Sequence, residues 1–406
     1  MIRTPIHRLL DVASAAALLI APTVLHPTPR TARAIMAVGV GLAAVTALTR
    51  YSRDQRKPVP MKAHLLLDAI QGAGFLAAGL ALQNQPKPVR VAMAGYGAFS
   101  LAVVAASERN PQRSTRQIPL ARSAVTGQRI GGALIEVASD IAYRRLGIVN
   151  VAFLGTPGAG DRGWVLIDAG LPGSARAIAA AAAHRFGPTA RPAAIILTHG
   201  HFDHVGALKA LAEKWEAPIY AHPLEHPYLV GLRSYPEADP GVGGGLMSAL
   251  SPLYPRHPIE VTDRLFPLPP DGTIPGAPGW QWLHTPGHTP GHVALWRASD
   301  RTLLSGDAII TTRQESAASV TTQTPELHGP PAYFTPDWQA AEHSIRLLAG
   351  LRPAHILSGH GRAVSGPALL PALDDLAGLD LQSLFSPVFN PKGLPAFVED
   401  MLQTVT

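Results

Sequence analysis

Hydrophobic residues are distributed very unevenly along the 406-residue chain. The first quarter contains four nearly continuous apolar runs of about 16–18 residues each, which as helices just span the hydrocarbon core of a bilayer. Helices that are apolar on nearly every face are typical of membrane spans, and small residues let them pack closely in lipid. We therefore expect four transmembrane helices rather than a soluble helical domain or a cleaved signal peptide. The runs cover residues 9–25, 34–49, 65–82 and 91–106.

The four runs look like one helical hairpin that occurs twice. An offset of 57 residues aligns His7 with His64 and Asp11 with Asp68, among other identical pairs. Several identities in register predict an internal repeat, with both hairpins entering the membrane from the same side. Each His–Asp pair has i, i+4 spacing and shares one helix face, where we favour a capping or interface role over a proton relay.

Charge separates this region from the rest of the chain. Overall, 47% of the residues are hydrophobic and 15% are charged, which excludes general disorder. Residues 1–115 have 13 Lys and Arg against 4 Asp and Glu, a net charge of +9, whereas the remainder has 21 against 24, a net charge of −3. The overall charge of +6 therefore belongs to the apolar region and does not indicate a nucleic-acid partner.

The same cations predict an orientation. Eleven Lys and Arg flank the runs on the side of the N-terminus and of the large following domain, and four lie on the other side. Cytoplasmic loops carry the excess of basic residues in membrane proteins. We expect a multi-pass protein of the cell membrane whose second domain is cytoplasmic.

Beyond a polar linker at 107–125, short strand-like runs alternate with helical segments, which is typical of a layered α/β domain. The Pro- and Gly-rich stretch 234–278 shows little pattern, and we expect it to form a lid or binding loop. Its glycine run at 243–245 lacks the strand–helix context and the lysine of a phosphate loop. Strands are expected at 133–137, 147–154, 164–167, 193–197, 218–221, 280–284, 293–297, 302–305 and 355–358, and helices at 174–185, 205–215 and 338–350.

The segment Thr198–His204, with the sequence THGHFDH, carries the strongest chemical signal. The chain has no cysteine, which excludes disulfides, thiolate metal sites and cysteine nucleophiles, but it has 17 histidines. A short loop of this kind can direct two imidazoles to one point and the next Asp and His to a second point about 3.5–4 Å away. Further candidate ligands recur at strand ends, at His288, Asp307 and His360.

These motifs together resemble those of the metallo-β-lactamase-fold hydrolases, over roughly residues 125–365. The resemblance implies an α/β fold, a four-layered αβ/βα sandwich, here preceded by an all-α transmembrane region of two duplicated hairpins. It implies that Asp168 orients the metal loop, and that Asp307 bridges two metal ions as in the glyoxalase II and lactonase branches. It assigns the first ion to His199, His201, His288 and Asp307, and the second to Asp203, His204, Asp307 and His360.

The implied cofactors are two divalent metal ions. Zinc fits the nitrogen and oxygen ligands, and iron or manganese fits them too. Two such ions supply a bridging hydroxide that attacks a carbonyl. Asp203 is expected to orient this hydroxide or to move its proton, and Tyr333 either hydrogen-bonds the substrate oxyanion or packs in the core. The other histidines are set aside as ligands: His284 and His292 next to the third motif, His222 and His226 in surface or capping roles, and His355 in a structural role.

We predict three parts: a four-helix transmembrane region at 1–116, a metallo-β-lactamase-fold catalytic domain at 117–365, and a helical tail at 366–406 that packs on it. The predicted function is a membrane-anchored hydrolase of a small ester, thioester or lactone, with a small-molecule substrate and the lipid bilayer as partners. Alternatives are an iron-dependent oxidoreductase resembling sulfur dioxygenases or flavin-linked di-iron proteins, a phosphodiesterase or nuclease, and a membrane sensor. The sequence does not determine the substrate or the oligomeric state.

Overall fold

The structure, a computed structural model, describes residues 4–51, 57–107, 118–240, 242–243, 245–256, 261 and 263–381. The chain divides into two compact units, residues 1–115 with 243–249, and residues 116–242 with 250–406. Each unit is described by itself. Much of the predicted linker and the tail beyond residue 381 lie outside the described residues.

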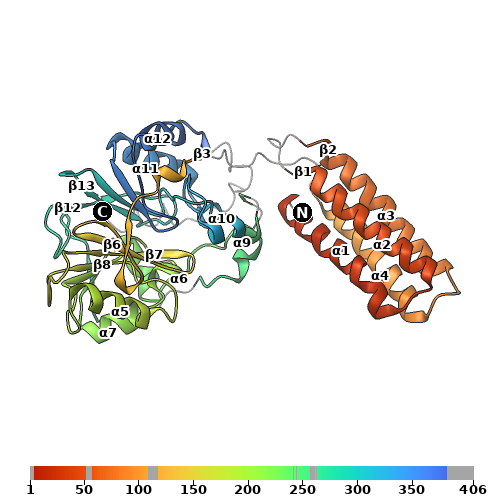
Figure 1. Cartoon of the computed structure of the whole chain (residues 1–406), viewed down its shortest axis with the longest axis horizontal. Helices are drawn as coiled ribbons and strands as arrows, with labels where there is room; N and C mark the ends of the chain where they lie inside the picture. The colour runs from red at the N-terminus through yellow and green to blue at the C-terminus, as the bar shows by residue number, and fades with distance from the viewer. Residues whose placement is uncertain are drawn as a thin grey trace. The chain divides into compact units, whose positions relative to one another are not determined.

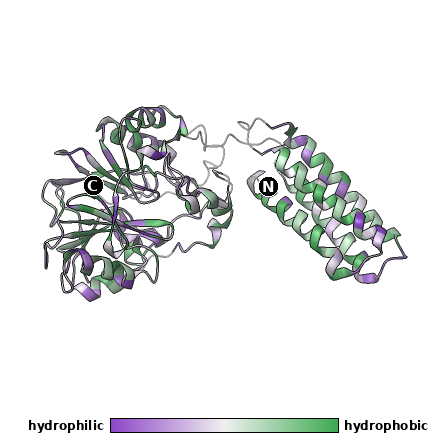
Figure 2. Ribbon diagram, viewed as in Figure 1, coloured by the Kyte–Doolittle hydropathy of each residue, from purple (hydrophilic) through white to green (hydrophobic). Residues whose placement is uncertain are grey.

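Four long helices form the N-terminal unit (Figure 1). They are α1 (Thr4–Leu25), α2 (Pro29–Leu48), α3 (Met61–Ala81) and α4 (Lys87–Ala106). All four are long and apolar enough to cross a membrane, with mean hydropathies of 1.3 to 1.7 over the spans. Apolar residues cover most of their surface, and polar residues gather towards their ends (Figure 2). This confirms the predicted helices, which begin several residues before the apolar runs because flanking polar residues continue each helix.

The helices pack as two hairpins, α1 with α2 and α3 with α4. Glycines bring α3 and α4 together: a Cβ atom built on Gly97 would overlap the backbone nitrogen of Leu76 and lie 2.5 Å from the carbonyl oxygen of Gly72. Close contact through small residues supplies the van der Waals packing that holds helices together in lipid. Gly95 lies on the same helix, but no atom lies within 4 Å of a Cβ built there.

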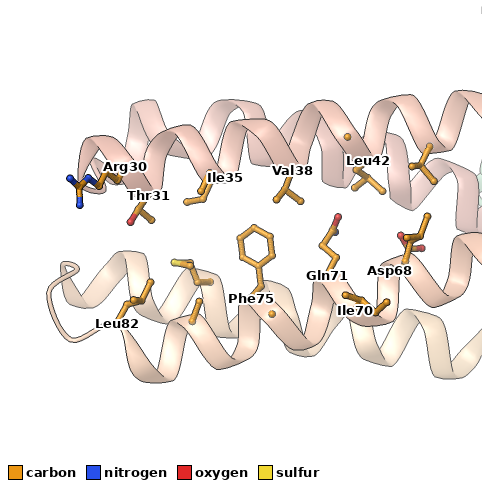
Figure 3. A pocket seen from close by; sticks show the side chains of 17 residues that line it. Arg30, Thr31, Ile35, Val38, Leu42, Asp68, Ile70, Gln71, Phe75 and Leu82 are labelled. Carbon is orange, nitrogen blue, oxygen red and sulfur yellow. The ribbon is translucent and has the colours of Figure 1, made fainter.

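Between α2 and α3 lies a cavity of about 590 Å³. Apolar side chains, such as Ile35 and Val38 of α2 and Phe75 of α3, line most of it (Figure 3). Asp68 and Gln71 line one end of the cavity, and Arg30 lines the opposite end. The cavity is therefore apolar in its middle and polar where the helices end.

Two sheets form the centre of the second unit (Figure 1). The eight-stranded sheet has the order β11-β10-β9-β8-β7-β6-β5-β4, and the five-stranded sheet has the order β12-β13-β14-β16-β17. The first sheet contains β4 (Gln128–Ile130), β5 (Leu134–Ala138), β6 (Ile141–Leu146), β7 (Val149–Leu154), β8 (Val165–Ile167), β9 (Ala194–Ile196), β10 (Ile219–Ala221) and β11 (Leu265–Pro267). The second contains β12 (Trp280–His284), β13 (Val293–Arg297), β14 (Thr302–Gly306), β16 (His355–Ser358) and β17 (Val364–Ser365).

The two sheets and the helices that cover them form four layers, as the alternation of side chains along the strands shows. Val293 and Leu295 of β13 pack against the first sheet in one core, whereas Ala294 and Trp296 face the other way. On that outer side α11 (Trp338–Gly350) and α12 (Leu369–Ala377) cover the second sheet. The helices α5 (Ala175–Phe186) and α7 (Leu208–Trp215) cover the first sheet in the same manner. The result is the αβ/βα sandwich that the sequence predicts.

Several elements differ from the prediction. Strand β6 was not predicted, because Arg144 and Arg145 interrupt the apolar pattern in this segment. The predicted helix 205–215 is α7 with a separate short α6 (Phe202–Val205) in front of it. The structure also has short elements that were not predicted, of which α9 lies in the stretch 234–278: α8 (His226–Leu229), α9 (Leu246–Leu250), α10 (Ala317–Thr322), β3 (Ile118–Pro119) and β15 (Glu326–Leu327).

The glycine packing predicts the effect of two matched substitutions. Gly97→Leu should lower the thermal unfolding temperature of the detergent-solubilised chain, because the side chain forces α3 and α4 apart at a cost of about 1–3 kcal/mol. Gly95→Leu, two residues away on the open side, is the control and should change it little. Equal effects of both substitutions would contradict this packing.

Candidate metal centre

The candidate ligands lie in loops at the ends of strands from both sheets. In the first sheet the parallel strands β8 and β9 end next to each other, so Asp168 lies beside the loop that starts at Thr198. In the second sheet the parallel strands β14 and β16 end at Gly306 and Ser358, just before Asp307 and His360. The turn between β12 and β13 carries His288. Segments that are far apart in the sequence therefore meet at one point.

Three histidines form the first part of the centre. Ring nitrogens of His199, His201 and His288 all lie within 4.8 Å of one another. Nδ1 of His201 is 2.9 Å from Nε2 of His288. The hydroxyl of Thr335 lies 3.3 Å from Nδ1 of His288 and donates its own proton to the carbonyl oxygen of Pro331. Nδ1 of His288 is therefore the protonated nitrogen, and its Nε2 presents a lone pair to the centre.

Hydrogen bonds to Nδ1 also fix the position of a proton on two other histidine rings. Nδ1 of His360 donates to the carbonyl oxygen of Ile148 over 2.7 Å. Nδ1 of His199 lies 3.1 Å from the Thr198 hydroxyl, which donates to Oδ2 of Asp168 and so accepts from the ring. Nε2 of His199 is therefore unprotonated and directed inward, as in a histidine prepared to bind a metal, whereas Nε2 of His360 faces Oδ2 of Asp307 at 3.0 Å.

Asp307 lies between the two predicted metal positions. Its Oδ2 is 3.0 Å from Nε2 of His360 and 3.5 Å from Nε2 of His288, and its Oδ1 is 3.5 Å from Nε2 of His204. Ligand atoms of Asp203, His204 and His360 also lie within 4.8 Å of one another. The structure thus brings all seven predicted ligands together, with Asp307 central to both groups.

Asp168 holds the ligand loop and does not itself join the ligand groups. Its carboxylate accepts hydrogen bonds of 2.8 Å each from the Thr198 amide, the Thr198 hydroxyl and Nδ1 of His204. Its backbone has a φ of +61°, a left-handed conformation that is unfavourable for most side chains. This matches the orienting role that the family resemblance implies for Asp168.

Electrostatics prepare the centre for cations. Burial lowers the pKa of His199 and His288 and lowers that of His201 to about 3, so these rings are neutral. Burial would raise the pKa of Asp307, but His360 and His204 beside it hold that pKa well below its usual range. The donor set therefore combines an ionised carboxylate with three neutral rings, and the pKa values of His204 and His360 are raised by the carboxylates that face them.

Glu225 is an important residue that the sequence analysis missed. It is completely buried, and its carboxylate accepts the amide protons of Gly200 at 2.9 Å and Gly291 at 2.8 Å as well as the Tyr235 hydroxyl proton. It thereby ties the ligand loop after β9 to the turn that carries His288. Its role follows from its spatial position beside the amides of Gly200 and Gly291, which the sequence does not reveal.

The remaining histidines take other roles. Nε2 of His292 accepts the amide proton of Asp307 over 2.9 Å, so this ring supports the central carboxylate without being a ligand. Nδ1 of His222 accepts the Leu224 amide proton at the start of a short helical turn, a capping role. His284 stacks on His222 with centroids 4.3 Å apart. His226 and His355 belong to α8 and β16, outside the ligand groups.

Tyr333 lies near the centre but outside hydrogen-bond contact. It is 4% exposed, and burial together with Glu315 and Asp203 raises its pKa well above the ordinary value. Tyr254 packs against it with ring centroids 6.0 Å apart. Among the described residues no side chain hydrogen-bonds to the Tyr333 hydroxyl. Its role at this position therefore stays a prediction.

The buried atoms themselves test whether metal ions fit. Within the described part of the chain, Nε2 of His199, Nε2 of His204 and Oδ1 of Asp307 are buried without hydrogen-bond partners. Such atoms are costly unless something binds them. Imidazole nitrogens and carboxylate oxygens are ligands of zinc, iron and manganese, so the residues fit divalent ions.

The Glu225 contacts predict a measurable effect on metal affinity. Glu225→Gln keeps the size of the side chain but directs an amide group at backbone N–H donors, so the two ligand loops separate. We expect zinc affinity, measured by competition with a chelator, to fall about 10–100-fold. Glu213→Gln, an exposed position on α7, should leave the affinity unchanged. Unchanged affinity in Glu225→Gln would contradict the proposed positioning role.

Comparisons with known proteins agree with this geometry. The Metallo-beta-lactamase superfamily profile matches residues 144–360. The chain is 47% identical over 246 residues to the "Probable metallo-hydrolase YflN" of Bacillus subtilis (strain 168), which covers 61% of this chain and 93% of that protein. It is 32% identical over 173 residues to "Probable metallo-hydrolase YybB" of the same strain, covering 43% and 66%.

Among solved structures, TTHA1623 in a di-iron-bound form shares 28% identity with a TM-score of 0.36, covering 55% of this chain and 92% of that one. The profile match spans the strands from β7 to β16 and all the ligand loops described above, and the match to YflN covers nearly the whole of that protein. The chain belongs to the metallo-β-lactamase superfamily.

Proposed function

We propose that this chain is a metal-dependent hydrolase with two divalent ions, anchored in a membrane by its four N-terminal helices, that cleaves a small ester, thioester or lactone. One observation carries the proposal: ligand atoms of His199, His204 and Asp307 lie within 4.8 Å of one another, buried and without hydrogen bonds. We assign the first ion to His199, His201, His288 and Asp307, and the second to Asp203, His204, Asp307 and His360. Zinc is the proposed metal.

The chain's own residues suit hydrolysis. When bound, two divalent ions supply a water of lowered pKa and a Lewis acid for the substrate carbonyl. Asp203 is buried, which raises the pKa of its carboxyl group, and its Oδ2 lies 3.5 Å from Nε2 of His360. A carboxylate of raised pKa at this place is suited to accept the proton of the attacking water. We assign Tyr333 as the donor to the substrate oxygen.

Aromatic side chains beside the ligands favour a substrate with an apolar portion. Phe334 lies 5.0 Å from the ring of His201, and Tyr254 lies 6.1 Å from Phe334 and 5.7 Å from Phe202, between ring centroids. The net charge of −3 after residue 115 gives no attraction for a phosphate backbone. A small ester, thioester or lactone fits these surroundings better than a nucleic acid.

The location follows from the apolar helices and the flanking cations. The four helices are long enough to cross a bilayer, and eleven flanking cations on one side against four on the other support a cytoplasmic location for the N-terminus and the hydrolase domain. We keep the proposed division at residues 1–116, 117–365 and 366–406. Of the last segment, α12 packs in the core of the domain through Leu373 and Leu376.

The ligand assignment predicts the behaviour of a double variant. His199→Ala with His201→Ala removes two ligands of the first ion, so kcat/KM should fall by more than about 100-fold, beyond the usual cost of losing an outer hydrogen bond, and bound metal should decrease. His284→Ala, an exposed histidine near the centre, is the control. A panel of thioesters, lactones, phosphodiesters and β-lactams identifies the substrate class, with metal quantified in the same samples.

Two results would overturn this function. Hydrolysis that is unchanged in the double variant would show that other residues perform the reaction. One iron ion per chain with oxygen consumption would favour the oxidoreductase alternative instead.

The topology is testable because the chain has no cysteine of its own. Gln83→Cys places one thiol in the exposed loop between α3 and α4, and Ser299→Cys places one in the exposed turn between β13 and β14. A membrane-impermeant maleimide should label Gln83→Cys in intact cells and Ser299→Cys only after lysis. The reverse pattern would invert the proposed orientation, and extraction of the chain by carbonate without detergent would refute membrane insertion.

A further inference from the structure

The four helices bring together a second cluster of metal-ligating side chains, remote in sequence from the hydrolase motifs. His7 and Asp11 come from α1, and His64 and Asp68 come from α3, so each hairpin contributes the same pair. All four side chains are buried, and the two histidines completely so. One ligand atom from each residue lies within 4.8 Å of the others. The predicted i, i+4 pairs thus meet across the repeat.

Hydroxyl groups at the ends of the other two helices set the protonation of both rings. Thr49 follows α2 and Ser107 follows α4, and each hydroxyl donates over 2.6 Å to the carbonyl oxygen four residues earlier. A hydroxyl has a single proton, so its oxygen can only accept from the histidine. Nδ1 of His64 lies 2.8 Å from Thr49, and Nδ1 of His7 lies 2.7 Å from Ser107. Both Nδ1 atoms therefore carry a proton, so either ring, when neutral, has its lone pair at Nε2.

The Nε2 atoms of both histidines face carboxylate oxygens. Nε2 of His7 is 3.0 Å from Oδ2 of Asp68 and 3.4 Å from Oδ1 of Asp11. Nε2 of His64 is 2.9 Å from Oδ2 of Asp11 and 3.1 Å from Oδ2 of Asp68. With neutral rings, the Nε2 lone pairs would repel these oxygens, and burial makes such repulsion costly unless protons or a metal cation lie between them. These separations resemble the roughly 3.3 Å between neighbouring ligands that lie about 2.0–2.1 Å from a tetrahedral zinc ion.

A divalent ion satisfies the cluster better than two additional protons. Two protons would also balance the two carboxylates, but they would create two imidazolium rings whose centroids are 5.3 Å apart inside a buried site. One divalent ion balances the same charge and leaves both rings neutral. The Tyr51 hydroxyl donates over 2.7 Å to Oδ2 of Asp11, and with Thr49 and Ser107 it supplies the outer hydrogen bonds that orient metal ligands.

The cluster also has an open side. Asp68 lines the cavity between α2 and α3, where its carboxylate lies at the end opposite Arg30 (Figure 3). A metal site requires an entry path for the ion, and Asp68 is the one of the four ligands that borders this space.

We propose that His7, Asp11, His64 and Asp68 bind one divalent metal ion of the zinc class, which links the two duplicated hairpins. This site is separate from the two ions of the proposed hydrolase centre. It takes two ligands from each hairpin, so binding holds α1 against α3.

The test counts metal in the full-length chain in detergent, in a background with the hydrolase ligands removed by His201→Ala, His204→Ala and His360→Ala. After metal removal, incubation with zinc and desalting, plasma mass spectrometry should find one zinc ion per chain, and zinc should raise the unfolding temperature. Cobalt in place of zinc should give the visible absorption of a tetrahedral site. Adding Asp11→Asn and Asp68→Asn, which preserve side-chain size, should abolish the metal, the stabilisation and the absorption.

Tyr96→Phe is the matched control, because this hydroxyl in the same bundle bonds Gln71 and contacts none of the four ligands. It should retain one zinc ion per chain. His64→Gln provides a milder variant if the double Asn variant does not fold, and it should weaken zinc binding at least about 10-fold. A folded background chain without zinc would overturn the proposal, and so would unaltered binding in the Asn and Gln variants. Neither result depends on hydrolytic activity.

Discussion

The carboxylate of Asp307 is the group on which the geometry of the hydrolase domain depends. It is 1% exposed, and a buried carboxylate is costly unless positive charge or hydrogen bonds compensate it. The compensating groups come from two separate segments: His204 from the loop after β9 of the first sheet, and His360 from the loop after β16 of the second. The domain can neutralise Asp307 only when its two sheets face each other, so the packing of the sandwich and the assembly of the centre are one event.

The hydrogen bonds around the ligands explain why the surrounding loops are so constrained. Each ring can direct a lone pair inward only if its other nitrogen has an acceptor, and Ile148 and Thr198 supply two of these acceptors. Glu225 then fixes the backbone of two ligand loops through amide donors at Gly200 and Gly291. A substitution in this outer layer therefore acts on metal binding without touching the metal.

The sequence predicts the ligand types and the layers well, because both are encoded at short range. The loop from His199 to His204 holds four ligands in six residues, and strand alternation is a local pattern. Glu225 could not be predicted, because its amide partners are 25 and 66 residues away and carry no distinctive side chain. Strand β6 was missed since Arg144 bonds to carbonyl groups of Gly132 and Ala177, a compensation that only the folded chain provides.

The same principle of tautomer control operates in the apolar bundle, and there it gives the duplication a physical meaning. One hairpin supplies a single His–Asp pair, and its histidine lacks a hydroxyl partner within its own hairpin, because His7 bonds Ser107 and His64 bonds Thr49. Each hairpin therefore contributes to the other in two ways. It orients the histidine ring of the other hairpin, and it adds two ligands to the shared cluster. A single hairpin would bury a histidine with no acceptor for Nδ1 and a carboxylate with no balancing charge. The association of the two copies therefore lowers the free-energy cost of burying these polar side chains in an apolar environment.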